Sequence, residues 1–321
     1  MSGWKRKAAI AASVGGVVVL ALGVVAGVPP LRFAVLRTVL PLTETLSVAP
    51  LRGGAYWVSG GIGNTGFVVG ASGVVAIDAQ MFVPTTRKEL EEIRRITAKP
   101  VDTVILTHSD PDHINGLPAF ASGIGVIAQE NAAREIRRVI AEPASNGFPP
   151  PPEIARYAPT KVVKDREEAL IDGVPMVLLH TAPAHTDGDL AVYLPAQRIV
   201  FAGDLLTPAI GPYPGIHLDK HGSSLGWIAS MKAILALDAD LYVPGHGDML
   251  PKDELARRLA AAERRRAEIK ALFDQGRSLE EARATLKDVA LKGLASRFPT
   301  FVETTYQELA AEQATPASAP K

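Results

Sequence analysis

The feature that most constrains this chain is a cluster of four metal-capable side chains within six residues, His108, Asp110, Asp112 and His113. Residues 104–106 are Val, Ile and Leu, an apolar run typical of a buried strand, and they lead directly into the cluster. A strand that ends this way presents two imidazoles and two carboxylates from one tight loop, a donor set suited to divalent metals. One loop cannot complete a closed coordination shell, so we expect further ligands from other parts of the chain.

Composition places the chain among folded globular proteins. It has 321 residues, 47% hydrophobic and 21% charged, which is enough to bury the core of one large domain or two ordinary ones. Lys+Arg and Asp+Glu balance at 34 each, so we expect no nucleic-acid partner. The absence of cysteine excludes disulfides, thiolate metal sites and a cysteine nucleophile.

The N-terminus predicts a membrane anchor in residues 1–30, followed by a connector in residues 31–50. A basic cluster at residues 5–7 precedes an uncharged apolar run over residues 8–28, close to the ~20 residues that a membrane-spanning helix needs. The basic cluster is expected on the cytoplasmic side, which places the catalytic domain outside the cytoplasm. A cleaved signal peptide, leaving an exported protein, and a buried soluble helix are the alternatives, although a signal's apolar core is usually only ~7–15 residues.

Residues 51–250 show alternating strand and helix patterns, which favour an α/β layered body. In the first half we expect strands and helices at residues 55–58, 64–70, 73–78, 85–97 (helix), 101–106, 125–128 and 131–140 (helix). The helix over residues 85–97 has an apolar face of Leu90, Ile93 and Ile96. Residues 143–152, rich in proline, predict an exposed connector or a semi-rigid lid whose Phe148 contacts substrate.

The second half continues the strand pattern and ends in helices. We expect strands and one helix at residues 160–163, 168–171, 174–180, 190–194, 198–204, 227–237 (helix) and 241–247. Residues 251–321 predict a C-terminal helical extension, with helices over residues 252–275, 279–294 and 301–309.

Further metal-capable residues follow later apolar strands, at His185, Asp204 and His246. A lone histidine is more often structural, as we expect for His180, but several strand ends of this kind in one chain are unlikely to arise by chance. Asp78 also ends an apolar strand, and it either caps a turn or accepts a hydrogen bond that orients a ligand loop.

These motifs resemble those of the metallo-β-lactamase-fold hydrolase superfamily. The matching pieces are Thr-His-Ser-Asp-Pro-Asp-His (107–113), Ala-His-Thr-Asp-Gly-Asp (184–189), Phe-Ala-Gly-Asp (201–204) and Pro-Gly-His-Gly (244–247). The resemblance covers residues 58–249 and implies an αββα four-layer sandwich with the site at one edge, between two sheets. It implies a small-molecule substrate but not which one, since the family cleaves lactams, lactones, thioesters, sulfate esters and phosphodiesters.

The resemblance also implies two divalent metal ions, with zinc expected. By position, the first metal would be held by His108, Asp110 and His185, and the second by Asp112, His113 and His246, with Asp204 bridging the two. A hydroxide between the metals would be the nucleophile, and Asp112 would orient the water or pass on its proton.

One departure from the family pattern concerns Asp110, where the family usually has a histidine. Two divalent metals carry four positive charges and three carboxylates remove three, which leaves +1 where the usual set leaves +2. The hypothesis that follows is a less acidified water and a first site that tolerates manganese or iron. A weak or empty first site fits the pattern equally well.

Tyr213, His217 and His221 lie in the segment after Asp204, and they are either substrate contacts or solvated loop residues. The leading function is a metal-dependent hydrolase of an ester, lactone, lactam or related bond. An iron-dependent oxidoreductase and a non-catalytic metal-binding protein on the same fold are the alternatives. The lack of a redox cysteine or flavin domain weighs against the first, and the nearly complete ligand set against the second. The pattern sets no oligomeric state.

Overall fold

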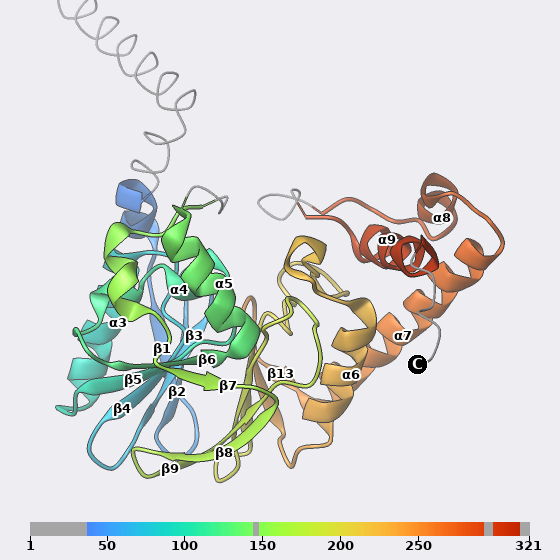
Figure 1. Ribbon diagram of the computed structural model, residues 1–321. Helices are drawn as coiled ribbons and strands as arrows, with labels where there is room; N and C mark the ends of the chain where they lie inside the picture. Colours follow the sequence, from blue (N-terminus) through green and yellow to red (C-terminus); the bar gives the residue numbers. More distant parts are fainter. Residues whose placement is uncertain (1–36, 144–147, 292–297, 315–321) are drawn as a thin grey trace, which may run out of the picture. The chain divides into compact units, whose positions relative to one another are not determined.

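The computed structural model describes residues 37–143, 148–291 and 298–314, and the chain divides into two units, Met1–Thr45 and Leu46–Lys321 (Figure 1). In the first unit, residues 37–43 are helical. The apolar run over residues 8–28, which the sequence predicts to be a membrane anchor, lies outside the described residues. Among the residues that are described, no helix has the length and apolar character to cross a membrane.

The second unit contains two sheets, each built from one half of the sequence. The seven-stranded sheet follows chain order: β1 (Ser47–Pro50), β2 (Ala55–Ser59), β3 (Thr65–Val69), β4 (Val74–Ile77), β5 (Val101–Ile105), β6 (Gly125–Gln129) and β7 (Lys161–Val163). The six-stranded sheet has the order β13-β12-β11-β10-β9-β8: β8 (Arg166–Ile171), β9 (Val174–Leu179), β10 (Ala191–Leu194), β11 (Ile199–Gly203), β12 (Leu241–Pro244) and β13 (Leu250–Pro251).

Helices connect the parallel strands and cover the outer faces of the sheets (Figure 1). The α-helices are α3 (Val83–Ile96), α4 (Pro111–Ile114), α5 (Glu130–Ala141), α6 (Ser224–Leu235), α7 (Lys252–Asp274), α8 (Leu279–Thr285) and α9 (Phe301–Ala314). Short 3-10 helices occur at η1 (Leu117–Ala119), η3 (Pro152–Tyr157) and η4 (Leu218–Lys220). Strands β4 to β7 are mutually parallel, as are β11 and β12, and parallel neighbours require such crossover connections.

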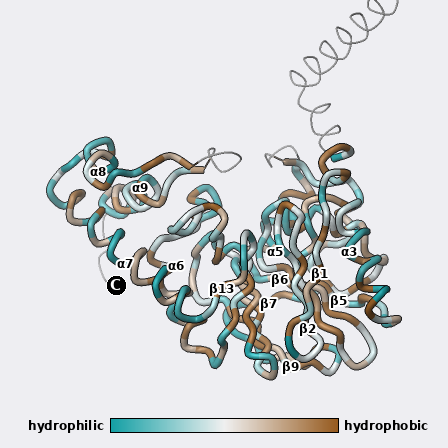
Figure 2. Tube along the Cα trace, turned by 180° about the vertical axis from the view of Figure 1, so that it is seen from behind, coloured by the Kyte–Doolittle hydropathy of each residue, from teal (hydrophilic) through white to brown (hydrophobic). Residues whose placement is uncertain are grey.

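Alternate residues of the central strands face different apolar clusters, which demonstrates the αββα layering. In β5, Ile105 packs between the sheets whereas Val104 packs under the helices of the first sheet. In β10, Val192 packs between the sheets and Tyr193 faces the cluster formed with α6, α7 and α9. Both faces of the sheets are therefore covered at these strands, and β10 and the last two residues of β5 are accordingly apolar and buried. In Figure 2 the hydrophobic colour gathers on the strands, and hydrophilic colour recurs along α3 and α7.

Three stretches differ from the sequence-based expectation. Ile96 is 39% exposed rather than buried, because the buried stripe of α3 runs through Glu89 and Ile93 and Ile96 lies in the last turn. The helix expected over residues 279–294 ends at Thr285, and Lys287 then adopts a left-handed φ of 51° that a helix cannot continue. The last residues of the expected connector form β1, which pairs antiparallel with β2.

Candidate metal centre

The cluster residues follow the ends of strands from both sheets. Asp78 follows β4, and His108 follows β5 and precedes α4, whose first residue is Pro111. From the other sheet, His185 comes after β9, Asp204 after β11 and His246 after β12. Proline suits the first position of a helix, where its missing N–H is not needed, so the loop turns into α4 and carries Asp112 and His113 with it.

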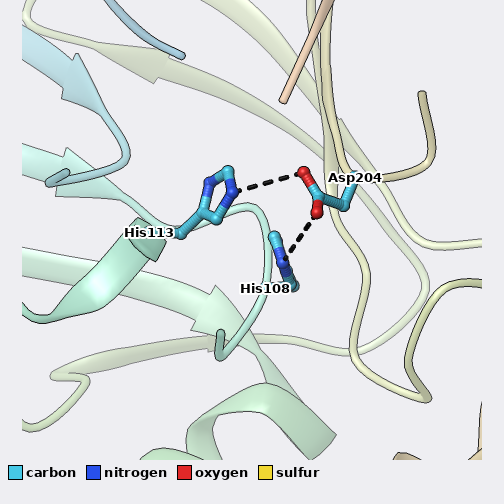
Figure 3. A group of neighbouring side chains, drawn as sticks. All are labelled: His108, His113 and Asp204. Carbon is cyan, nitrogen blue, oxygen red and sulfur yellow. Dashed lines mark ion pairs between the residues drawn. The ribbon is translucent and has the colours of Figure 1, made fainter. Parts of the chain in front are cut away.

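Asp204 faces histidines of both groups, and Figure 3 shows its carboxylate between His108 and His113. Its Oδ1 atom is 3.2 Å from His113 Nε2. Its Oδ2 atom lies 3.9 Å from His108 Nε2, 3.6 Å from His185 Nε2 and 3.3 Å from His246 Nε2. One carboxylate therefore faces imidazoles of both groups to which the sequence assigns a metal, as expected of a bridging ligand.

The first group brings together His108, Asp110 and His185, whose ligand atoms all lie within 4.8 Å of one another. Asp110 Oδ2 is 3.8 Å from His108 Nε2 and 3.4 Å from His185 Nε2. On the outer side, Lys220 Nζ donates to Asp110 Oδ1 at 2.6 Å, and His217 Nε2 is 3.5 Å from Oδ2. Asp110 thus directs one oxygen at the imidazoles and the other at a lysine.

The second group brings together Asp112, His113 and His246, again within 4.8 Å. Asp112 Oδ2 is 3.1 Å from His246 Nε2 and 3.9 Å from His113 Nε2. Gly245 precedes this histidine, and a Cβ atom added there would lie 1.8 Å from Asp204 Oδ1. The close approach of the chain to Asp204 therefore requires glycine at position 245.

Backbone carbonyls orient two of the imidazoles. His185 Nδ1 lies 2.9 Å from the carbonyl oxygen of Gly215, and His246 Nδ1 lies 2.9 Å from that of Ile62. A carbonyl only accepts, so each Nδ1 is the donor, and in the neutral form of each ring Nε2 carries the lone pair toward the cluster. This is the arrangement that metal-ligating histidines adopt.

Asp78 orients the other two imidazoles. Its Oδ2 is 2.8 Å from His113 Nδ1 and also accepts from Thr107 Oγ1 at 2.8 Å, while Oδ1 accepts from the Thr107 N–H at 2.8 Å. The Thr107 hydroxyl, having donated to Asp78, is left to accept from His108 Nδ1 at 3.0 Å. The hydrogen bonds therefore favour the orienting role for Asp78 over a turn cap, and through Thr107 it serves one imidazole of each group.

Several polar atoms at the centre lack a hydrogen-bond partner. His108 Nε2, His113 Nε2 and Asp204 Oδ1 are buried and make no hydrogen bond, although both nitrogens lie within 4 Å of an Asp204 oxygen. Leaving buried polar atoms unsatisfied costs on the order of 1–3 kcal/mol each. Imidazole nitrogens and carboxylate oxygens that converge without partners fit a divalent metal ion, so the residues present suit the group that the sequence implies.

The electrostatics of the cluster favour a bound cation. Burial, the largest influence, would raise the pKa of Asp204, but His246 and its neighbours outweigh burial and hold that pKa well below its usual range. Burial lowers the pKa of His108 to about 3, so this imidazole is neutral. Burial also acts to lower the pKa of His185 and His246, but Asp110 and Asp204 outweigh it and raise them to about 9 and about 10. Without a metal, His185 and His246 bind protons at the imidazoles that a metal ion would otherwise coordinate.

The residues predicted as substrate contacts, and the histidine predicted to be structural, lie in different surroundings. His217 lies against Asp110, as described above, whereas His221 is exposed and has a left-handed φ of 55°. Tyr213 stacks on Phe301 of α9, with ring centroids 5.4 Å apart. The Phe148 ring packs edge-on against Phe82 at 5.9 Å. His180 is buried, with Nδ1 2.8 Å from the Asp189 carbonyl oxygen, which suits the structural role expected of it.

Lys220 is a residue of the site that no sequence pattern identifies. It is separated from Asp110 by 110 positions and belongs to no motif. Only the fold of residues 217–222 brings its ammonium group to the cluster.

Among curated proteins, the chain is 31% identical to the alpha subunit of 2,4-dinitroanisole O-demethylase from Nocardioides sp. (strain JS1661), over 63% of this chain and 58% of that subunit. It is 25% identical to linear primary-alkylsulfatase from Pseudomonas sp. (strain ATCC 19151), over 54% of this chain and 39% of the enzyme. The chain thus spans about half the length of these curated relatives.

Solved structures share the fold. A metallo-beta-lactamase from Pontibacter korlensis superposes with a TM-score of 0.56 at 20% identity, covering 68% of this chain and 99% of that one. The sec-alkylsulfatase Pisa1 from Pseudomonas sp. superposes with a TM-score of 0.63 at 18% identity, covering 86% and 52%. The family model of the metallo-beta-lactamase superfamily matches residues 58–246, a range that contains the whole cluster. The chain belongs to the metallo-beta-lactamase superfamily.

Proposed function

We propose that the protein is a metal-dependent hydrolase with two divalent metal ions, one held by His108, Asp110 and His185 and the other by Asp112, His113 and His246, with Asp204 shared. The observation that carries this proposal is the convergence of oriented imidazole Nε2 atoms on both oxygens of one buried carboxylate. The metals would supply an acidified water as nucleophile and a Lewis acid for the scissile bond.

Asp112 is the residue best placed to move a proton. Burial acts to raise its pKa, but His113 and His246 outweigh burial and lower it, so the carboxylate is ionised and can accept a proton. Its side chain is 19% exposed, against 6% for Asp204 and 10% for Asp110, so it is the carboxylate of the cluster most open to solvent and substrate. We assign it the role of orienting the water and passing its proton on.

The relatives support a choice of which bonds to test first. The names of the O-demethylase and the alkylsulfatase both describe release of a group bound through oxygen, an ether in one and a sulfate ester in the other. We place ethers and sulfate esters first among the bonds to test, ahead of carboxylic esters, lactones and lactams.

For the metals, zinc is the first choice, because imidazoles dominate the cluster and suit zinc. The oxygen of Asp110 is a harder ligand than an imidazole and leaves manganese or iron open at the first site.

The N-terminal pattern supports a location outside the cytoplasm. We propose that residues 8–28 anchor the protein in the membrane with Leu46–Lys321 on the far side, the alternative being export after signal cleavage. Membrane fractionation with protease accessibility, together with N-terminal sequencing of the mature chain, separates the two. A protein protected in the cytoplasm would contradict both.

The experiment that tests the function uses the full-length chain in mild detergent. Metal content is measured by elemental analysis, and hydrolysis of aryl methyl ether, alkyl sulfate, aryl ester, lactone and β-lactam probes is measured before and after chelation. Near two metals per chain with turnover that the chelator removes and added metal restores is the expected result. Bound iron with oxygen uptake and no hydrolysis would indicate the oxidoreductase. Bound metal with no turnover of any kind would favour the non-catalytic alternative, and no metal at all would overturn the ligand assignment.

A further inference from the structure

The ammonium of Lys220 occupies a position that the proposed metal chemistry does not by itself require. It donates to Asp110 Oδ1 at 2.6 Å, and both side chains are largely buried, with 16% of the lysine and 10% of the aspartate exposed. A buried cation within hydrogen-bond distance of a metal-ligating carboxylate affects how much charge that ligand presents to the metal.

The position of Lys220 is set by the segment that carries His185. The His217 N–H donates to the His185 carbonyl at 2.8 Å, and the Asp187 N–H donates to the Lys220 carbonyl at 2.9 Å. A Cβ atom added at Gly222 would lie 2.4 Å from the His185 carbonyl oxygen, so the two segments are in close contact. The lysine is therefore held against the cluster by backbone contacts and does not reach it as a flexible surface side chain.

No other carboxylate competes closely for this ammonium. Across the described residues, its ion pair is with Asp110. The neighbouring Asp219 is 78% exposed and faces His217, at 3.3 Å from Nδ1. Glu135, which also faces this region, is paired with Arg138 at 2.6 Å. The positive charge of Lys220 thus acts mainly on Asp110.

A charge count shows the consequence. Two divalent metals and the carboxylates of Asp110, Asp112 and Asp204 leave a net charge of +1, and the ammonium of Lys220 restores it to +2. A neutral imidazole at position 110 with no lysine beside it gives the same +2. An aspartate paired with a lysine is therefore electrostatically equivalent to an imidazole at this position.

We propose that Asp110 and Lys220 act together as one charge-neutral ligand of the first metal, with Asp110 binding through Oδ2 alone and Lys220 holding Oδ1. The proposal rests on the proposed dinuclear site and specifies how its first half is built. Lys220 is a positioning and charge-balancing residue, because it acts through Asp110. It follows that Asp110 does not lower the positive charge at the centre, so any preference for manganese or iron comes from the hardness of its oxygen alone.

The test is a double-mutant cycle on metal affinity, with Asp110→His, Lys220→Met and the double variant in the full-length protein. Each is also made with His246→Ala, which removes a ligand of the second site so that the first site is titrated alone. Zinc and manganese affinities are measured by competition with a chromophoric chelator, so the readout does not depend on any substrate.

The expected results differ in sign. Asp110→His leaves Lys220 as an uncompensated cation beside the metal and weakens first-site affinity by about tenfold or more. Lys220→Met leaves affinity equal or tighter, because a positive charge is removed next to a cation. The double variant returns to within about threefold of the wild type. Lys220→Arg keeps the charge and stays near the wild type.

Other patterns overturn the proposal. Equal weakening by both single variants with an additive double variant would show that Lys220 only props Asp110 in place. Wild-type affinity in Asp110→His would show that the lysine charge does not reach the metal. If the wild type binds metals and only the cycle fails, the proposed function stands and this inference falls; if the wild type binds none, both fall.

Two controls keep the test interpretable. Lys232→Met makes the same chemical change at an exposed pair between Lys232 of α6 and Glu263 of α7, and should leave metal affinity unchanged. Circular dichroism and thermal unfolding check each variant, and Asp110→Asn, nearly isosteric, replaces Asp110→His if the imidazole prevents folding. The expectation for it is the same: weakening alone, relieved by Lys220→Met.

Discussion

The two halves of the candidate metal centre are built from similar donors but are balanced differently. In the first group, Asp110 has one oxygen on the imidazoles and the other on Lys220. In the second group, the ion pairs of Asp112 among the described residues are with His113 and His246 only. The second half therefore presents its full carboxylate charge to a metal, whereas the first half presents a carboxylate that is already neutralised.

The halves also differ in where their supports come from. His113 is held by the carboxylate of Asp78, and His246 by the carbonyl of Ile62, both near the strands of the seven-stranded sheet. His185 is held by Gly215, in the same loop that brings Lys220 to Asp110. The first half also depends on the sheet edge, where Thr107 and Asp78 orient His108, but only the first half depends on this loop. Substitutions in the loop should therefore change the first site and spare the second.

The largest effect is expected from the residue that the two halves share. Asp204→Asn removes the negative charge facing four imidazoles, so both metals should be lost, with affinities falling by more than the 10–100-fold typical of a supporting residue. Elemental analysis after dialysis measures the loss, and circular dichroism checks the fold. Full occupancy of either site in this variant would show that Asp204 does not bridge.

The next largest difference between the two halves is expected in how strongly their metal affinities depend on pH. In the first group, His108, with a pKa of about 3, is a neutral imidazole at neutral pH, whereas His185, with a pKa of about 9, carries an additional proton. In the second group, burial acts to lower the pKa of His113 and His246, but nearby carboxylates outweigh it, raising the first well above its usual range and the second to about 10. These raised values mean that protons compete with metal below pH 9.

Metal affinity should therefore fall as the pH is lowered. We expect a fall of about tenfold per pH unit at the first site, where metal binding displaces one proton, and of about a hundredfold at the second site, where it displaces two. Affinities measured between pH 6 and 8, with calorimetry in buffers of different ionisation enthalpy, count the protons released. Equal slopes at the two sites would contradict the assignment of imidazoles to the halves.

The predictable parts of this molecule are those that depend on short stretches of sequence. Strand ends mark His108, Asp204 and His246, because a strand places its last side chain at the sheet edge whatever its neighbours are. The family pattern then supplies the pairing of the sheets, which no single stretch encodes.

The parts that were not predictable depend on contacts between distant segments. Lys220 reads as an ordinary charged loop residue until the fold sets it against Asp110. Glu89 reads as part of the solvated face of α3, yet it is buried, where burial raises its pKa to about 8 despite hydrogen bonds from Thr65 and Gln80. Helical periodicity identifies which residues share a face, but not which polar residues the surroundings can accept.

Substitution of the residues that orient the imidazoles, Asp78 and Thr107, should reduce metal affinity by smaller amounts that differ between the two sites. Asp78→Asn weakens the hydrogen bond to His113 directly and that to His108 through Thr107, so second-site affinity should fall by about 10–100-fold and first-site affinity by less. Thr107→Val removes the hydroxyl that contacts His108 and also donates to Asp78, but the Thr107 N–H still holds Asp78, so we expect the first site alone to weaken. Chelator competition in the Thr107→Ser variant, which keeps the hydroxyl, is the matched control. A second site weakened by Thr107→Val would mean that the supports are not separable.

The smallest effect is expected at His217, and it decides whether the first half has a further ligand. Its Nε2 lies 3.5 Å from Asp110 Oδ2, while its ring packs against Phe298 at 4.9 Å and its Nδ1 faces Asp219. Since the convergent ligand atoms of the first group come from His108, Asp110 and His185, we expect His217→Ala to change first-site affinity by less than about threefold. The exposed His221→Ala variant is the control for loss of an imidazole from the same loop. A drop of tenfold or more in His217→Ala alone would make His217 a metal ligand, and the first half would then hold one imidazole more than the second.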